Sequence, residues 1–284
     1  MVSELTSDLY CLAHERSAAI GAIILELIGM TSAILLNLAL NEAAAMPSLS
    51  LVSEQTITQT NVITHPVSVC SAFGTIYFAG GLLPLFFTLS TTYFTKRALR
   101  SGWIHGSLVG NRTASSLFCE LVFLSGIVCL ISLFFFFAAH AFALCLIDFP
   151  ATAIDDLDDA IPWAMTMWVS CLCSCLIGQT IACAVRNNGI ALCLSSLFGS
   201  GALGAVATPA IQALAESNHL LAQIFHYSPY AITRLIGTGP QGLIEQIEGE
   251  PIIAFTFLAL QLILSLIASS LCLRSAIARS MPWS

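Results

Sequence analysis

Long apolar runs alternate with short polar stretches along the chain, and the runs have the length of membrane-spanning helices. A helix needs about 20 apolar residues to cross a hydrocarbon core about 30 Å thick. Six runs reach this length, at residues 18–40, 67–94, 117–147, 162–185, 190–213 and 252–273. The pattern predicts an all-α integral membrane protein with six transmembrane helices in a single domain, residues 1–284. Glycines before Pro209 predict an irregular far end for the fifth run.

The composition excludes a water-soluble protein. The chain is 57% hydrophobic and only 9% charged, with a mean hydropathy of +0.88. Soluble domains carry about 25% charged residues, so this chain lacks the polar side chains to cover a water-facing surface. Most of the 11 cysteines stand inside apolar runs. We therefore expect them to be packing residues, without disulfides.

The basic residues predict which helix ends face the cytoplasm. With six spans and the N-terminus inside, eight of the nine Lys and Arg residues fall in cytoplasmic segments, whereas the opposite orientation leaves only Arg234 there. The positive-inside rule therefore predicts that both termini are cytoplasmic. The predicted external loops are acidic. Either they form a solvated rim, or they attract a cationic substrate.

The segment at residues 96–112, between the second and third runs, is basic and predicted to be cytoplasmic. Leu99, Trp103 and Ile104 can form the apolar face of a short interfacial helix, with the basic residues at its start on the polar side. Two interpretations stay open. The segment is either a charged loop that fixes the topology or a helix on which a cytoplasmic partner docks.

The order of residues in this segment carries a resemblance to a known family. The relevant steps are Lys96-Arg97, Arg100-Ser101-Gly102, Trp103-Ile104, Leu108-Val109 and Asn111-Arg112. In that order they resemble the region after span two in the permeases of ABC-2 type transporters. Two positions depart from the family pattern: Gly110-Asn111 stands where a Pro is common, and Glu120 stands at or near a frequent Lys.

Other parts of the chain are similar to the same family. Residues 4–16 could supply the N-terminal interfacial helix of such permeases, and a very short turn joins the fourth and fifth runs. Residues 220–235 are too short to span yet apolar, and the Tyr227–Tyr230 step resembles one in the re-entrant helices of the family. We therefore expect a re-entrant segment between helices five and six, with an external amphipathic helix lying flat on the membrane as the alternative.

The resemblance implies a permease subunit of an ATP-driven exporter in the bacterial cell membrane, which would carry a peptide, antibiotic or other amphipathic compound. No GxxxxGK[ST] sequence is present, so this chain is not expected to bind nucleotide by that device. ATP and Mg²⁺ are then bound by a separate ATP-binding cassette subunit, and no catalytic, cofactor or metal residues are expected here. A second permease copy or a paralogue completes a dimer within the membrane lipid. No nucleic-acid partner is expected.

The resemblance also assigns roles to particular residues. The residues implied in coupling to the ATP-binding subunit are Arg97, Arg100, Gly102, Trp103, Ile104 and Arg112. Candidate path or gate residues are Glu26, Glu120, Tyr227 and Pro229. The two carboxylates are included because charges within membrane spans are energetically costly and by default suggest a function.

Two other functional classes stay open as alternatives. One is a membrane-embedded enzyme that acts on a lipid, which would need His, Asp or Glu clustered at one membrane depth. The other is a secondary transporter, for which an internal repeat is typical. Cys171, Cys173 and Cys175 could suggest a soft-metal site, but on a helix Cys173 points away from the other two. We expect these cysteines to pack, and His140 to be a hydrogen-bonded packing residue near the outer interface.

Overall fold

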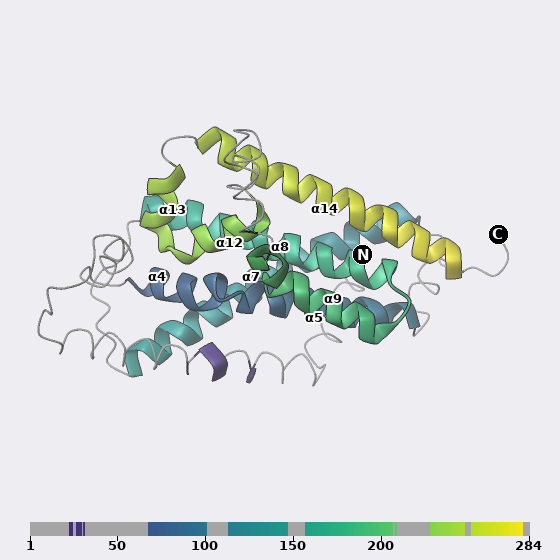
Figure 1. The fold of residues 1–284 in the computed structure, drawn as a ribbon, viewed down its shortest axis with the longest axis horizontal. Helices are drawn as coiled ribbons and strands as arrows, with labels where there is room; N and C mark the ends of the chain where they lie inside the picture. Colours follow the sequence, from purple (N-terminus) through teal and green to yellow (C-terminus); the bar gives the residue numbers. More distant parts are fainter. Residues whose placement is uncertain are drawn as a thin grey trace, which may run out of the picture.

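The computed structural model describes residues 23–24, 27–29, 31, 68–100, 113–146, 157–206, 208, 228–247 and 251–280. Within these ranges all regular structure is helical, with no strands. The principal elements are α4 (Val69–Phe73), η2 (Gly74–Ala79), α5 (Leu82–Arg100), α7 (Ala114–Leu146), α8 (Leu157–Ala184), α9 (Asn188–Gly199), α12 (Pro229–Gly237), α13 (Gly239–Ile247) and α14 (Pro251–Ser280). They form an elongated bundle (Figure 1).

Three helices are long and apolar enough to cross a membrane: α7, α8 and α14. A fourth crossing is obtained if the bent pair Val69–Ala79 and Leu82–Arg100 counts as one span. Helices α7, α8 and α14 correspond to the third, fourth and sixth predicted spans, and the bent pair corresponds to the second. The first predicted span lies mostly outside the described residues, so six crossings stay a prediction.

The second predicted span, residues 67–94, is not one straight helix. The chain bends by 50° between η2 and α5. Gly81 at the bend has a φ of 69°, a conformation that favours glycine. A Cβ at Gly81 would lie 2.8 Å from the carbonyl oxygen of Ser200. The bend thus packs directly against the residue that follows α9.

The fifth predicted span is also interrupted, as its glycines indicated. Helix α9 ends at Gly199 after 12 residues, and Gly201 follows with a φ of 70°. A short helical stretch then covers residues 202–206. The irregular far end predicted from these glycines is therefore present, and because α9 alone is shorter than a span, a fifth crossing over residues 190–213 stays a prediction.

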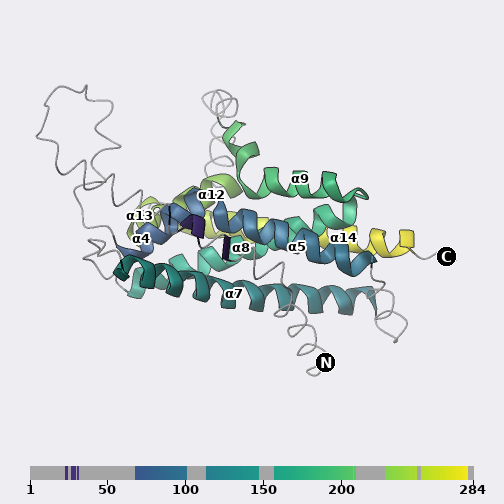
Figure 2. The same ribbon diagram turned by 90° about the horizontal axis from the view of Figure 1, so that it is seen from below.

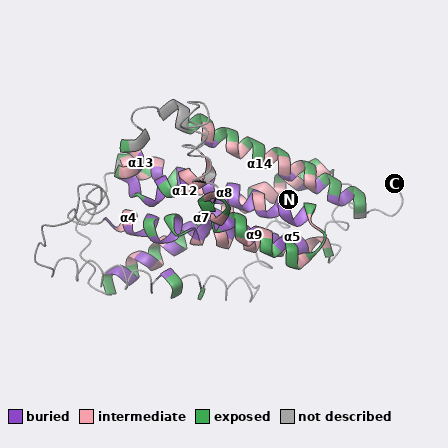
Figure 3. Ribbon diagram, in the orientation of Figure 1, coloured by how far each residue is buried: buried purple, intermediate pink, exposed green. Residues whose placement is uncertain are grey.

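Helix α8 lies at the centre of the bundle. Figure 2 shows α5, α8 and α14 in a middle layer, with α9 on one side and α7 on the other. Buried positions gather where these helices meet, while α14 keeps a largely exposed outer face (Figure 3). A Cβ at Gly178 of α8 would lie 2.4 Å from the carbonyl oxygen of Thr88 in α5. A glycine therefore permits the two backbones to approach closely, as small residues do between membrane helices.

The short helices α12 and α13 pack at the opposite end from α9. The Trp163 indole donates a hydrogen bond to the Ile236 carbonyl at 2.9 Å, and the Thr75 hydroxyl donates to the Gly237 carbonyl at 2.9 Å. Ile236 is fully buried. These contacts bind the C-terminal end of α12 to both η2 and α8. Of the predicted re-entrant segment, residues 220–227 lie outside the described part, and its depth in the bilayer stays a prediction.

Candidate functional site

Charge is segregated along the bundle. Of the described basic residues, all except Arg234 lie where α5, α8 and α14 finish and α7 and α9 begin (Figure 2). They are Lys96, Arg97, Arg100, Arg186, Arg274 and Arg279. The opposite end carries Asp158 and Asp159 in the first turn of α8, and Glu245 in α13. We call the first group the basic end of the bundle.

Lys96 joins α5 to the end of α8. Its side chain is 8% exposed, and its ammonium group donates to the carbonyl of Val185 and, at 3.3 Å, to that of Arg186. The last carbonyls of a helix have no partners within the helix, and cations near them are favoured by the helix dipole. Lys96 therefore stabilises the turn between α8 and α9 from the neighbouring helix.

Helix α14 contributes two further cations at this end. Arg279 donates to the Cys183 carbonyl of α8 at 2.8 Å, and Arg274 donates to the Ser115 hydroxyl at the start of α7 at 2.9 Å. Together with Lys96, these contacts link four helices through side chains on the charged end. The side-chain contacts of the basic end thus connect α5 with α8, so a displacement of α5 would act directly on α8.

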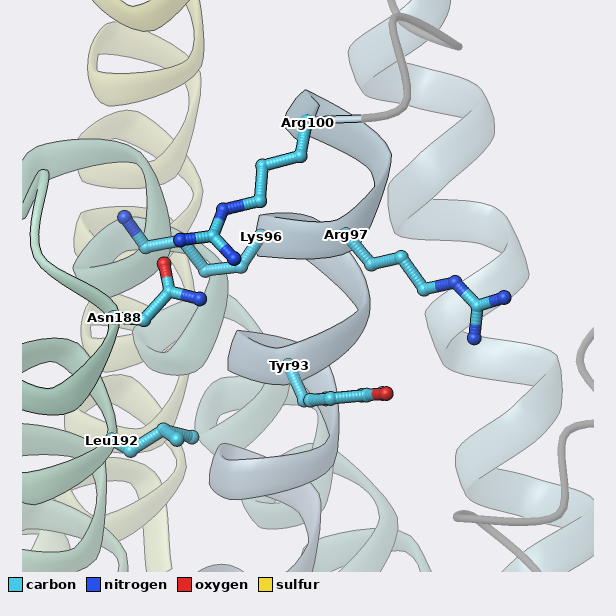
Figure 4. Close-up of a pocket in the computed structure, with 6 residues that line it drawn as sticks. All are labelled: Tyr93, Lys96, Arg97, Arg100, Asn188 and Leu192. Atoms are coloured by element: carbon cyan, nitrogen blue, oxygen red, sulfur yellow. The ribbon is translucent and has the colours of Figure 1, made fainter.

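A cavity of about 350 Å³ opens at the basic end between α5 and α9. The described residues that line it are Tyr93, Lys96, Arg97, Arg100, Asn188 and Leu192, and none of these six is acidic. The side chains of Lys96 and Arg100 turn toward α9 and Asn188, whereas Arg97 turns to the opposite side of α5 (Figure 4). The cavity thus joins a cationic wall on α5 to the first turn of α9.

The predicted coupling residues are only partly described. Arg97 and Arg100 occupy the final turns of α5, which continues to Arg100, beyond the predicted end of the span at residue 94. They therefore belong to the long helix itself, and both line the cavity. Gly102, Trp103, Ile104 and Arg112 lie outside the described residues.

The candidate path residues are not brought together. Glu120 is half-buried on α7, near the basic end. Pro229 occupies the first turn of α12, after Ser228, whose hydroxyl caps the helix by accepting from the Ala231 amide. Pro is suited to this position because its missing N–H needs no partner there. Glu26 and Tyr227 lie outside the described residues.

His140 and about half of the described cysteines are packing residues in the described core, whereas Cys119, Cys145 and Cys193 are exposed. His140 is fully buried edge-on to the rings of Phe73 and Tyr77, and neither ring nitrogen has a hydrogen-bond partner among the described residues. Its predicted packing is therefore confirmed, whereas the predicted hydrogen bond is not found within this part of the chain. Cys175 meets Cys129 of α7 with 3.4 Å between the sulfur atoms. No group of three or more His, Cys, Asp or Glu suited to a metal occurs among the described residues.

Sequence reasoning missed two functional features of this end. It placed Lys96 only on the polar side of an interfacial helix, whereas the structure buries it against the carbonyls of Val185 and Arg186, directly after α8. It treated Asn187 and Asn188 only as a short turn. Asn187 caps α9 by accepting from the Gly189 and Ile190 amides, and Asn188 faces the cavity. An Asn before an apolar run was the available signal for the cap.

Comparisons with known proteins do not add to this picture. The sequence matches no model of a protein family, and no similar curated protein and no similar solved structure was found.

Proposed function

We propose that this chain is the membrane-spanning permease subunit of an ABC-2 type transporter in the bacterial cell membrane. In this proposal it crosses the bilayer six times with both termini in the cytoplasm, and it exports a peptide, antibiotic or other amphipathic compound. A separate ATP-binding cassette subunit binds ATP and Mg²⁺, and two permeases face each other. The observation that carries the proposal is the basic end, where α5 finishes directly before the segment that resembles the coupling region.

The contacts at the basic end supply a physical route for coupling. A partner that moves residues 101–112 would act on the last turns of α5 first. Lys96 ties those turns to the Val185 and Arg186 carbonyls at the end of α8, and Arg279 ties α8 to α14. A rigid helix carries a displacement along its length, so such a movement would reach the bend at Gly81. That bend packs against Ser200, so the movement would also act on the residues that follow α9.

The test of the proposal is whether the chain works with an ATP-binding subunit. We expect a tagged full-length chain, purified from membranes of its source organism, to retain a protein with a phosphate-binding loop. The isolated chain should have no ATPase activity, and the complex should hydrolyse ATP at a rate that the permease changes. Retention of no such protein, or ATP turnover by the isolated chain, would contradict the proposal.

A pair of variants locates the coupling surface. Replacing Trp103 with Asp puts a charge on the predicted apolar face, so the ATP-binding subunit should dissociate or lose its response to the permease. His105→Asp adds the same charge in the same segment on the opposite side of the predicted helix, and should leave the complex intact. An intact and normally responding complex in both variants would leave this segment a topology signal only.

A further inference from the structure

We propose that the cavity at the basic end binds the headgroup of an anionic phospholipid that carries hydroxyl groups, such as phosphatidylglycerol. The proposal rests on the membrane placement in the proposed function, with the basic end at the cytoplasmic face. It does not require an ATP-binding partner. Its basis is the chemistry of the cavity walls between α5 and α9.

The cationic wall suits a phosphodiester. Arg100 is an exposed side chain on the last turn of α5, and its guanidinium reaches over the cavity toward Asn188 (Figure 4). Lys96 adds a second positive charge at the same wall, although its ammonium group is already bonded to two carbonyls. An arginine fork matches phosphate oxygens in geometry as well as in charge. No acidic side chain among the described lining residues competes for this position.

The opposite wall carries an unused acceptor. The Oδ1 atom of Asn188 is buried and has no hydrogen-bond partner among the described residues. A buried acceptor without a partner is unfavourable, and a hydroxyl donor would satisfy it. The glycerol of phosphatidylglycerol offers such a donor within reach of its own phosphate. A phosphate next to Arg100 together with a hydroxyl on Asn188 therefore uses both walls.

The surroundings favour a lipid over a free anion. Leu192 lines the cavity and is 37% exposed, and Ile190 on the same helix is 54% exposed. On a membrane-spanning bundle these apolar side chains face acyl chains, so a headgroup in the cavity leaves its tails along α9. In other membrane proteins, basic pockets between helices on the cytoplasmic side bind anionic lipid headgroups.

The experiment is a lipid titration of the purified full-length chain, followed by native mass spectrometry. We expect phosphatidylglycerol to bind more tightly than phosphatidylcholine with the same acyl chains, and soluble glycerol phosphate to compete poorly. Arg100→Gln should weaken phosphatidylglycerol binding roughly fivefold, the effect of one cation near an anionic surface. Arg186→Gln is the matched control, because Arg186 is exposed at the same end and does not line the cavity. It should change binding less than twofold.

A second variant tests the hydroxyl contact. Asn188→Ala should reduce the preference for phosphatidylglycerol over phosphatidic acid, which lacks the glycerol hydroxyls, without removing the cationic wall. Three results would overturn the proposal: equal binding of phosphatidylglycerol and phosphatidylcholine, equal losses in Arg100→Gln and Arg186→Gln, or full competition by glycerol phosphate. The readout is bound lipid, so these outcomes do not depend on the ATP-binding partner. The lipid proposal can therefore be rejected while the transporter proposal stands, and the reverse.

Discussion

Helices α7 and α8 are both long enough to cross a membrane, yet they occupy opposite positions in the bundle. Helix α7 is the more hydrophobic, and only 22% of its most apolar window is buried inside the protein. The corresponding window of α8 is less hydrophobic and is 50% buried. In a soluble protein the more apolar helix would take the centre. Here the order is reversed, because lipid is as apolar as the protein core and hydrophobicity does not drive helices together.

Small and polar residues explain why α8 takes the centre. Gly178 lies against the backbone of α5, and Thr92 donates to its carbonyl at 3.1 Å. Gln179 of α8 accepts from Ser269 of α14 at 2.8 Å. Helix α7 instead presents large apolar side chains to the outside, with Phe134 77% exposed. Close backbone approach and hydrogen bonding, more than hydropathy, therefore select the central helix.

The largest expected effect is at the closest approach of α8 to α5. Gly178→Leu should destabilise the folded protein by about 3 kcal/mol, because its Cβ meets the backbone carbonyl of Thr88 and the two helices must move apart. The measurement is the thermal unfolding midpoint in detergent. Gly126→Ala on α7 is the control, since a Cβ there meets only Trp168 at 3.6 Å. If both changes lowered the unfolding midpoint equally, close backbone approach at a glycine would not explain why α8 rather than α7 is central.

Two phenylalanines on α7 test the claim that its outward face contacts lipid. Phe136 is 1% exposed and packs on the rings of Tyr77 and Phe86, whereas Phe134 is 77% exposed. Phe136→Ala should cost about 3 kcal/mol, comparable with Gly178→Leu, mainly from the cavity left behind. Phe134→Ala should change the unfolding midpoint little, because lipid replaces the lost ring. A larger effect at Phe134 would place that face of α7 against protein.

The end of α8 depends on side chains from its neighbours. Lys96→Met should destabilise the protein by about 1.5 kcal/mol, because the Val185 and Arg186 carbonyls lose their donor. Arg186→Gln, which changes an exposed side chain and keeps its backbone carbonyl, should leave the unfolding midpoint close to that of the parent. If Lys96→Met were as stable as the parent protein, Lys96 would not stabilise the end of α8.

The smallest effect is expected between α8 and α14. Ser269→Ala removes the hydrogen bond to Gln179 and should cost about 0.6 kcal/mol, the typical value for polar pairs between membrane helices. A double-mutant cycle with Gln179→Leu isolates this term, because each single change removes the same bond. A coupling energy near zero would show that packing alone holds α14 to α8.

Part of this architecture followed from the sequence alone. The predicted spans at residues 117–147, 162–185 and 252–273 correspond to α7, α8 and α14, because a run of about 20 apolar residues is a local signal. The glycines after Ser196 indicated the end of α9 for the same reason. The bend at Gly80 and Gly81 was missed. Two glycines in an apolar run permit a bend without requiring it, and the contact with Ser200 decides it.

The apolar runs and the low charge content predict a membrane protein, and the sequence places its basic residues in a few short segments. The central place of α8, the burial of Lys96 against its end and the cavity shared by Arg100 and Asn188 all depend on contacts between helices. The physical reason is the range of the interactions. Partition into a bilayer depends on neighbouring residues, whereas the contacts of Thr92 with Gly178 and Ser195 join residues separated by 86 and 103 positions.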